Sequence, residues 1–487
     1  MNMPRLALRP PQRPDFSAVA LVLGAMLMAV LAGLVTSYLP WLFTLLLVLL
    51  PLVLVASISR PMVGLVVVLM FIFEVVPSAF QPRLPFGGGR LQAYDVLLLY
   101  LAGLVLLRAW MTRTPPLLSM GPVRWPLYYL LVCVAVSLVY VRYFAPNTLS
   151  LGEARVFVAW LLVPIMALAV DTPARYRWML RSVLAIALVI ALYVSSQSLF
   201  DLRIMTGARV ELLDKDLNSD VVRSIAGGGI YVVIFAIFLL INRMLERKFG
   251  WWWAVPAALL LVFGVAVQFG RGVWLSALAG LLVSAALFRG YAGVLRVLLL
   301  GSFTVALMLS AAAVFKPRLA EAVVERALGI GYELQSGGSY GWRRMENQAA
   351  LNRIERNPLL GVGLGGQYKQ TASSEGHFGI EGTYIHNGYM FFPLKMGLAA
   401  SFIPLAFIIA FVVVLRQGVQ QHRDDPDAGL VAALAGAFTV PCVASYTQPE
   451  WADPRGISAI AILFGLALLF RRFGAVQPAA RARSTGR

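Results

Sequence analysis

Residues 384–389 have the sequence YIHNGY, and they close the one long polar segment of the chain, which runs from residue 316 to residue 397. Apolar sequence lies on both sides of this segment. A helix that crosses a membrane needs about 20 mostly apolar residues, and the flanking sequence repeats that pattern many times. The sequence therefore predicts one helical membrane domain that carries one large insertion outside the membrane.

The composition also indicates a polytopic membrane protein. Of the 487 residues, 60% are hydrophobic and 13% are charged, against roughly 45–50% and about 25% in soluble proteins. The net charge of +18 would suggest nucleic acid in a soluble chain. Here most arginines lie in short connections between apolar runs, so we interpret them as topology signals and contacts to membrane lipids. We expect no nucleic-acid partner.

About fourteen transmembrane helices are predicted, which defines the fold class as an all-α polytopic integral membrane protein. The apolar runs cover residues 17–37, 39–57, 61–80, 94–110, 126–144, 155–170, 177–199, 223–242, 252–269, 272–288, 293–315, 398–416, 428–447 and 455–470. The first run lacks a small-residue cleavage site, which predicts an uncleaved helix rather than a signal peptide. Cys133 and Cys442 lie inside apolar runs, and we expect no disulfide or metal role for them.

Lys and Arg in the connections predict the orientation of the chain. With a cytoplasmic N-terminus, the inner segments hold 22 of these residues and the short outer connections hold 10. This bias predicts that both termini are cytoplasmic and that the polar segment lies outside the membrane. The predicted order is a cytoplasmic tail (1–15), eleven helices (16–315), a large outer loop or cap (316–397), three helices (398–471) and a basic cytoplasmic tail (472–487).

Two outer segments are too long for simple turns. Residues 201–222 contain five acidic residues mixed with basic ones, and residues 316–385 contain eight Lys and Arg against seven Asp and Glu. The second segment has helix-like pieces from Arg318 to Leu328 and from Arg343 to Arg356, the latter stopped by a proline. Because a loop of that length with its own structure is more often functional than decorative, we predict a small helical cap over the outer membrane face.

Arg223, Arg271 and His386 each stand directly before a predicted helix that runs inward from the outer face. A helix N-terminus offers unpaired N–H groups and roughly half a positive charge. A guanidinium placed there makes an anion site. The three residues together therefore predict a site that captures a pyrophosphate.

Each arginine also has a plainer interpretation. Arg271 lies between two helices with almost no loop, where its alternative role is to reach lipid headgroups. The alternative for Arg223 is an ordinary helix flank, and the three glycines from residue 227 to 229 allow a ligand or a neighbouring helix to approach the backbone.

His386 is one of three histidines. The alternative to a functional role for it is a structural role at a helix start. Tyr384, Asn387 and Tyr389 add polar groups beside it, and an imidazole accepts a proton or binds phosphate near neutral pH. Glu74 lies near the outer end of an apolar run, where it either faces a cavity or is buried without a role.

Other motifs exclude several chemistries. Residues 361–366 read GVGLGG and so contain a literal GxGxxG, but no strand precedes it and no βαβ unit follows. We interpret it as a flexible turn after a helix and not as a dinucleotide site. No HExxH, CxxC pair, DxD or P-loop is present, so the sequence predicts neither a metal nor an ATP site, and we expect no cofactor.

These residues resemble the O-antigen ligase and O-antigen polymerase (Wzy) superfamily over about residues 220–415. The resemblance is carried by the RGxW motif from Arg271 to Trp274, by a helix from Arg343 that runs into the NPLLGVGLG sequence at residues 357–365, and by His386-Asn387 before a helix that contains Gly397. Elsewhere the likeness is one of hydropathy only.

The resemblance implies a GT-C-like membrane fold and a metal-independent, inverting glycosyl transfer from an undecaprenyl-pyrophosphate-linked glycan at the periplasmic face of the bacterial inner membrane. It implies catalytic roles for Arg223, Arg271 and His386, and it aligns Arg343 with the arginine before the glycine-rich turn. As further substrate-binding candidates we name Trp274, Glu74, Asn387 and Tyr389. His386 is either the general base or a further phosphate contact.

Three classes of function remain open at this stage. A polymerase would join two lipid-linked repeat units, and a ligase would move the glycan to lipid A core; the helix number favours the polymerase. A transporter for a lipid-linked sugar is the rival, but the sequence shows no internal repeat and no charged pathway through the inner halves of the helices. A non-catalytic assembly partner is the third.

Overall fold

The computed structural model describes residues 51–76, 81, 83–86, 89–113, 120–200, 210–213, 218–224, 226–246, 250–328, 339–368, 382–424 and 427–474. The chain forms two compact units, residues 1–64 and residues 65–487. In the first unit, residues 51–59 are helical and α3 (Pro61–Ile72) begins. The helix predicted at residues 17–37, most of the next one, the predicted N-terminal tail and residues 475–487 of the predicted C-terminal tail lie outside the described residues.

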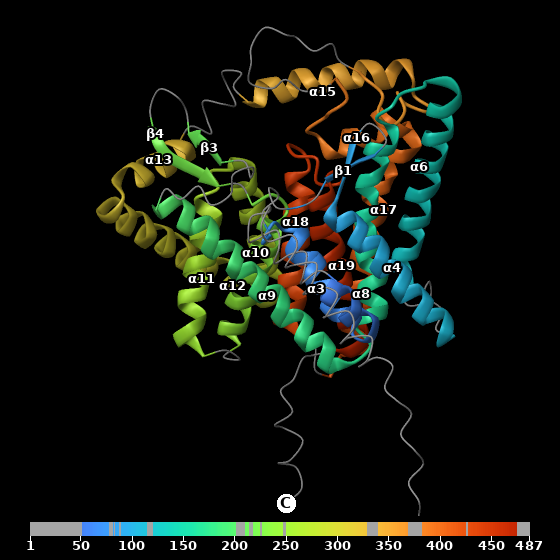
Figure 1. The fold of residues 1–487 in the computed structure, drawn as a ribbon. Helices are drawn as coiled ribbons and strands as arrows, with labels where there is room; N and C mark the ends of the chain where they lie inside the picture. Colours follow the sequence, from blue (N-terminus) through green and yellow to red (C-terminus); the bar gives the residue numbers. More distant parts are fainter. Residues whose placement is uncertain are drawn as a thin grey trace, which may run out of the picture. The chain divides into compact units, whose positions relative to one another are not determined.

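The second unit is mainly helical. Its elements are β1 (Arg83–Phe86), β2 (Gly89–Gln92), α4 (Ala93–Met111), η2 (Gly121–Val123), α6 (Arg124–Phe144), α7 (Ser150–Ala154), η3 (Arg155–Leu161), α8 (Leu162–Ala169), α9 (Pro173–Phe200), β3 (Val210–Leu213), β4 (Asn218–Ser224), α10 (Gly229–Leu245), α11 (Trp251–Ala266), α12 (Arg271–Phe315), α13 (Pro317–Leu328), α15 (Ser339–Arg356), α16 (Gly388–Met396), η4 (Leu398–Ser401), α17 (Phe402–Gln421), α18 (Ala428–Ala444) and α19 (Pro454–Phe473). Figure 1 shows their arrangement.

Seven helical segments in the described part of the chain are long and apolar enough to cross a membrane by length and composition. Five further apolar helices have 10–17 residues. The chain is therefore a helical membrane protein. The total of about fourteen spans stays a prediction, since the first predicted runs fall largely outside the described residues.

The structure changes three details of the predicted architecture. The run at residues 61–80 is helical only to Ile72, because Gln81 Nε2 donates to the carbonyls of Phe71 (2.9 Å) and Val76 (2.8 Å) and the chain turns at Glu74, whose φ is 57°. The runs at 272–288 and 293–315 form one element, α12, with a kink at Gly290 (φ 61°). Two antiparallel hairpins, β1–β2 and β3–β4, were not predicted.

The centre of the second unit is α19, of which 83% of the span is buried. It packs against η3, α8, α17 and α18. Aromatic pairs fill the space between these helices: Trp160 stacks on Phe407 with ring centroids 3.9 Å apart, Phe411 stacks on Phe438 at 3.8 Å, and Phe464 meets Phe411 edge-on at 5.1 Å. Each such pair contributes about 0.5–1.5 kcal/mol beyond the area it buries, so this cluster fixes the positions of α17, α18 and α19.

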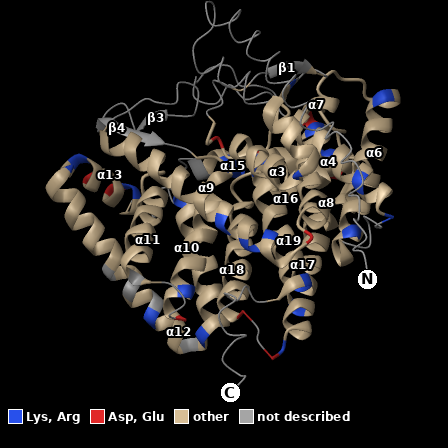
Figure 2. Ribbon diagram, turned by 60° about the horizontal axis from the view of Figure 1, so that its bottom comes forward, with Lys and Arg blue, Asp and Glu red and all other residues tan. Residues whose placement is uncertain are grey.

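The functional candidates gather at the end of the helices where α10, α12, α16 and α19 begin, which we call the site end. In Figure 1, α15 lies across this end, and the β3–β4 hairpin and α13 lie at the same end. The helices predicted within the polar segment are present as α13, α15 and α16. Figure 2 shows that α13 carries both basic and acidic residues, while most of the described ribbon is uncharged.

Candidate active site

The loop between α18 and α19, residues 445–453, connects the starts of several helices. Tyr231, in the first turn of α10, places its hydroxyl 3.4 Å from Gln448 Oε1. A Cβ built on Gly272, at the start of α12, would lie 3.0 Å from Thr447 Oγ1 and 3.8 Å from Gln448 Nε2. A Cβ on Gly388, the first residue of α16, would lie 3.2 Å from the Gln448 carbonyl oxygen. Three helices with the same direction at this end therefore begin around Gln448.

His386 stands two residues before α16 and is held by Glu346 of α15. The backbone N–H of His386 donates to Glu346 Oε2 at 2.9 Å. The same oxygen lies 2.9 Å from Nδ1 of the His386 ring. The Glu346 side chain is 7% exposed and the imidazole is 21% exposed. A buried carboxylate that contacts both the backbone and the ring of one histidine fixes its position and its ring orientation.

Two tyrosines surround this pair. The ring of Tyr384 meets the imidazole of His386 edge-on, with centroids 4.8 Å apart. The hydroxyl of Tyr368 donates to the Tyr384 carbonyl at 2.7 Å. Burial, and then the negative charge of Glu346, raise the pKa of Tyr368, so its hydroxyl stays protonated. This shell ties the segment before α16 to the end of the glycine-rich turn.

Arg271 is the first residue of α12, one position before the predicted helix start. Its Nε donates to the carbonyl of Arg326 in α13 at 2.8 Å. Trp274, one turn further along, donates from Nε1 to the Val265 carbonyl at 3.1 Å and so ties α12 to the end of α11. The short 268–270 connection bends at Phe269, whose φ is 52°.

The predicted position of Arg223 at a helix start is wrong. Arg223 lies in β4, where it pairs with Glu211 of β3, and α10 begins only at Gly229. Val221 and Val222 favour the strand, and the glycines after residue 226 break the run before the helix. Only the backbone of Arg223 belongs to the described structure, and β4 packs against α13.

Glu74 forms an ion pair with Arg455 in the first turn of α19, at 2.5 Å from Oε1 to a terminal guanidinium nitrogen. A Cβ on Gly227 (φ 50°) would lie 2.9 Å from Arg455 Cδ, and one on Gly228 would lie 2.3 Å from the Arg455 carbonyl. These glycines therefore admit the start of a neighbouring helix, one of the two alternatives that the sequence left open.

Asn387 and Tyr389 use their polar atoms within the protein. The side-chain oxygen of Asn387 caps α16 by accepting from the N–H groups of Tyr389 (3.0 Å) and Met390 (3.2 Å). The hydroxyl of Tyr389 donates to the Cys442 carbonyl at 2.6 Å. Arg343, half-buried on α15, stands three residues before Glu346 and so on the same side of that helix.

The glycine-rich turn is packed against the protein, in contrast to the flexible turn that we predicted. Val362 N–H donates to the Leu394 carbonyl at 2.8 Å, and Leu398 N–H donates to the Pro358 carbonyl at 2.8 Å. Gly361 has a φ of 63°, and a Cβ there would lie 2.3 Å from the Leu394 carbonyl oxygen. The turn holds α16 in place.

A buried carboxyl completes the electrostatics of the 445–453 loop. Burial, helped by the neighbouring Asp453 and opposed by a hydrogen bond from Tyr231, raises the pKa of Glu450 from 4.5 to about 8. Glu450 is therefore protonated at neutral pH and adds no full negative charge beside the helix starts. Among the described residues, no group of three or more His, Cys, Asp or Glu is arranged to hold a metal ion.

Sequence reasoning missed three residues at this end: Glu346, Gln448 and Arg326. Glu346 had a weak signal, because it follows Arg343 by three residues on a predicted helix. Gln448 and Arg326 had none, since only the folded chain brings them to helix starts that lie far away in the sequence.

Residues 256–405 match the family model described as O-Antigen ligase (Wzy_C). This confirms the resemblance to the O-antigen ligase and polymerase superfamily over a region that begins in α11 and ends in α17, and that includes Arg271, Arg343 and His386. No curated protein matches the chain.

Proposed function

We propose that this chain, which carries the O-antigen ligase domain over residues 256–405, transfers a glycan from undecaprenyl pyrophosphate to an acceptor hydroxyl at the periplasmic face of the bacterial inner membrane. The observation that supports this most strongly is the meeting of α12 and α16 at Gln448. It brings the segment of Arg271 and the segment of His386 to one place.

Arg271 binds the donor pyrophosphate in this proposal. As the bond between the sugar and the phosphate breaks, negative charge grows on the leaving group, and a guanidinium at a helix N-terminus stabilises that charge. Pyrophosphate leaves without protonation, so no general acid is required. We retain Arg223 as a second candidate for this role, because its strand β4 packs against α13, which in turn packs against α12.

His386 acts as the general base. Nδ1 faces Glu346 at 2.9 Å, which favours the tautomer with the proton on Nδ1 and assigns Nε2 to the acceptor. The acceptor oxygen attacks the anomeric carbon, its proton passes to Nε2, and the bond to undecaprenyl pyrophosphate breaks with inversion. The imidazolium that forms is stabilised by the adjacent carboxylate. Glu346 therefore favours the base over the phosphate contact.

The remaining candidates support this geometry. Arg343 lies on the Glu346 side of α15, and we propose that it contacts the glycan or its phosphate. Trp274, Asn387 and Tyr389 bond to backbone atoms of the protein, so we propose that they hold the helix starts and bind substrate indirectly. We propose the same for Glu74 through its ion pair with Arg455.

The acceptor is either a second lipid-linked glycan or lipid A core. We favour the first, a polymerase, because the sequence predicts about fourteen helices. The orientation, with both termini cytoplasmic and residues 316–397 forming a periplasmic cap, is part of the proposal and follows from the distribution of Lys and Arg.

Purified protein reconstituted with a lipid-linked glycan, without metal or ATP, tests the proposal. We expect release of undecaprenyl pyrophosphate together with a longer or transferred glycan, and the choice of acceptor separates polymerase from ligase. Transbilayer movement of the donor without release would indicate a transporter instead. Neither release nor movement would indicate an assembly partner.

Single substitutions assign the roles in the same assay. Arg271→Ala should lower transfer by about 10²- to 10³-fold and His386→Ala should abolish it, while both variants remain folded. His422→Ala is the matched control, because His422 contacts the Arg471 carbonyl at the end of α19 remote from the site end. Full activity of either site variant would remove that residue from the mechanism.

A further inference from the structure

Two arginines meet at the end of the helices opposite the site end, where α6 begins and α19 ends. Arg124 lies in the first turn of α6, and Arg471 lies in the last turn of α19. A Cβ built on Gly121 of η2 (φ 56°) would lie 2.6 Å from Arg471 Nη2 and 2.8 Å from Arg471 Cζ. The guanidinium of Arg471 therefore lies directly against the start of the continuous η2–α6 helix, and Arg124 follows one turn later.

The packing of α17 on α19 places Arg471 at this position. A Cβ on Gly418 of α17 would lie 3.3 Å from Arg471 Cα, so the missing side chain lets the two helices approach closely. Arg471 Nη1 donates to Gln417 Oε1 at 2.9 Å, and the Arg471 carbonyl accepts from His422 Nε2 at 3.0 Å. These contacts fix the end of α19, but the partner of the guanidinium is a neutral amide and leaves its charge uncompensated.

Neither arginine is neutralised within the described part of the chain. No carboxylate there lies within ion-pair distance of Arg124 or Arg471. Arg124 Nε is buried without a hydrogen-bond partner among the described residues, and its guanidinium lies over the Trp125 ring, 5.0 Å from the centroid. A helix N-terminus carries a partial positive charge and disfavours cations beside it. Two such arginines at a helix start therefore indicate a site for an anion.

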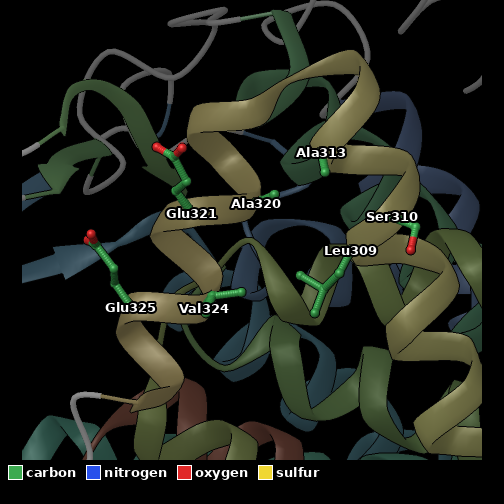
Figure 3. A pocket seen from close by; sticks show the side chains of 7 residues that line it. All are labelled: Leu309, Ser310, Ala313, Ala320, Glu321, Val324 and Glu325. Atoms are coloured by element: carbon green, nitrogen blue, oxygen red, sulfur yellow. The ribbon is translucent and has the colours of Figure 1, made fainter.

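The groove between α12 and α13 has the opposite character (Figure 3). Small and apolar side chains such as Leu309 and Ala313 line it, together with the acidic residues Glu321 and Glu325. None of the described residues that line it is basic. This groove therefore offers an anion no cationic partner, in contrast to the start of η2.

The surface of α6 beside Arg124 is apolar and exposed. Only 17% of the span is buried within the protein. Leu131 and Val132 follow Arg124 by seven and eight positions and so share its face of the helix, and they are 60% and 59% exposed. Trp125 is 63% exposed, and tryptophan is enriched where a membrane meets water. An anion at this depth that also covers the apolar face is a lipid with a charged headgroup.

We propose that Arg124 and Arg471 bind the headgroup phosphate of an anionic phospholipid, and that its acyl chains lie along the exposed face of α6. A guanidinium presents a planar fork of donors that matches phosphate oxygens. An anionic headgroup suits the pair better than a zwitterionic one, which would bring a further cation beside two uncompensated positive charges. The bound lipid joins the start of η2 to the end of α19 and so stabilises the packing of α6, α17 and α19. The site lies at the end remote from the candidate active site and does not depend on the proposed function.

The test measures the melting temperature of the full-length protein in an uncharged detergent as dioleoyl phosphatidylglycerol is added. We expect a saturable rise, whose midpoint gives the half-saturating lipid concentration. Dioleoyl phosphatidylcholine has the same acyl chains with a zwitterionic headgroup and should give a smaller rise. Glycerol phosphate, which carries the anion without the chains, should give none at the same concentrations.

Variants of the two arginines locate the site. Arg124→Ala and Arg471→Ala should each raise the half-saturating concentration of phosphatidylglycerol by about tenfold, as expected for the loss of a hydrogen bond to a charged group. Arg142→Ala is the matched control, because it removes the same charge from an exposed position in the last turn of α6. It should leave the half-saturating concentration unchanged.

A third variant, Gln417→Glu, keeps both arginines and the shape of the contact but gives Arg471 a carboxylate partner. It should weaken the response to phosphatidylglycerol while the melting temperature without lipid is kept, so it decides the question even if an arginine variant does not fold.

Several results would overturn the proposal. An equal rise with phosphatidylcholine would indicate a general effect of lipid, and an equal rise with glycerol phosphate would indicate a site for free phosphate. An unchanged half-saturating concentration in Arg124→Ala, Arg471→Ala or Gln417→Glu, or an equal increase in Arg142→Ala, would place the lipid elsewhere. None of these measurements uses glycan transfer, so the outcome is separate from that of the proposed function.

Discussion

The substitution Glu346→Gln gives the sharpest test of the His386 geometry. Glu346 Oε2 lies 2.9 Å from both the backbone nitrogen and Nδ1 of His386. Hydrogen bonds to a charged group contribute about 1.5–3 kcal/mol, against about 0.5–1.5 kcal/mol between neutral groups. Glutamine keeps the shape of the side chain but loses the charge, so we expect the two bonds to weaken by about 2–3 kcal/mol in total.

The half of that loss that belongs to the Nδ1 contact, about 1–1.5 kcal/mol, should appear in the chemical step, because the carboxylate interacts most strongly with the imidazolium, which forms only as the acceptor is deprotonated. The half that belongs to the backbone N–H affects stability instead. At 1.36 kcal/mol per tenfold change in rate, we expect kcat to fall about 5- to 13-fold while KM for the donor stays unchanged. The assay is release of undecaprenyl pyrophosphate at saturating acceptor. Glu355→Gln is the control, because Glu355 is an exposed carboxylate on the same helix.

Two results would refute the reasoning. If Glu346→Gln retained kcat within about threefold of wild type, with an unchanged melting temperature, Glu346 would not support a base. If donor KM rose while kcat was kept, His386 would be a phosphate contact, the role that the proposed mechanism rejects. If Glu346→Gln and Glu346→Ala both lower the melting temperature, activity normalised to the amount of folded protein separates this loss of stability from a loss of catalysis.

Three further predictions follow from the same end of the molecule. Arg271→Ala should lower kcat/KM for the donor by about 10²- to 10³-fold, with partial recovery in Arg271→Lys, as measured by product release at low donor concentration. Burial raises the pKa of Glu450 from 4.5 to about 8, so the folded protein keeps a proton that the unfolded chain loses, and stability should fall as the pH rises from about 4.5 through about 8. Melting temperatures across that range should decline in wild type and stay flatter in Glu450→Gln. Arg455→Met should destabilise the protein by about 3–5 kcal/mol because it leaves Glu74 buried without its partner, and adding Glu74→Gln should restore most of the lost melting temperature.

Local signals in the sequence predicted the helices well. The lengths of the apolar runs predicted most spans of the second unit to within a few residues. The helices of the polar segment were predicted because proline and glycine mark where they end. The early end of α3 was missed because Gln81, nine residues beyond the helix, supplies the hydrogen bonds that end it. A hydropathy pattern does not show that a side chain beyond the helix folds back onto the helix end.

Pairing between distant segments explains what the sequence did not reveal at the candidate site. Arg223 was assigned to a helix because the run after it is apolar, but hydropathy does not distinguish a strand before three glycines from a first helical turn. Arg326 stands 55 residues after Arg271, in a helix whose charges look like an ordinary solvated face. A helix start is recognisable in a sequence, whereas the residues that a distant helix brings to it depend on tertiary packing. In this protein the packing of α13 against α12 brings Arg326 to the start of α12, where its carbonyl accepts from Arg271.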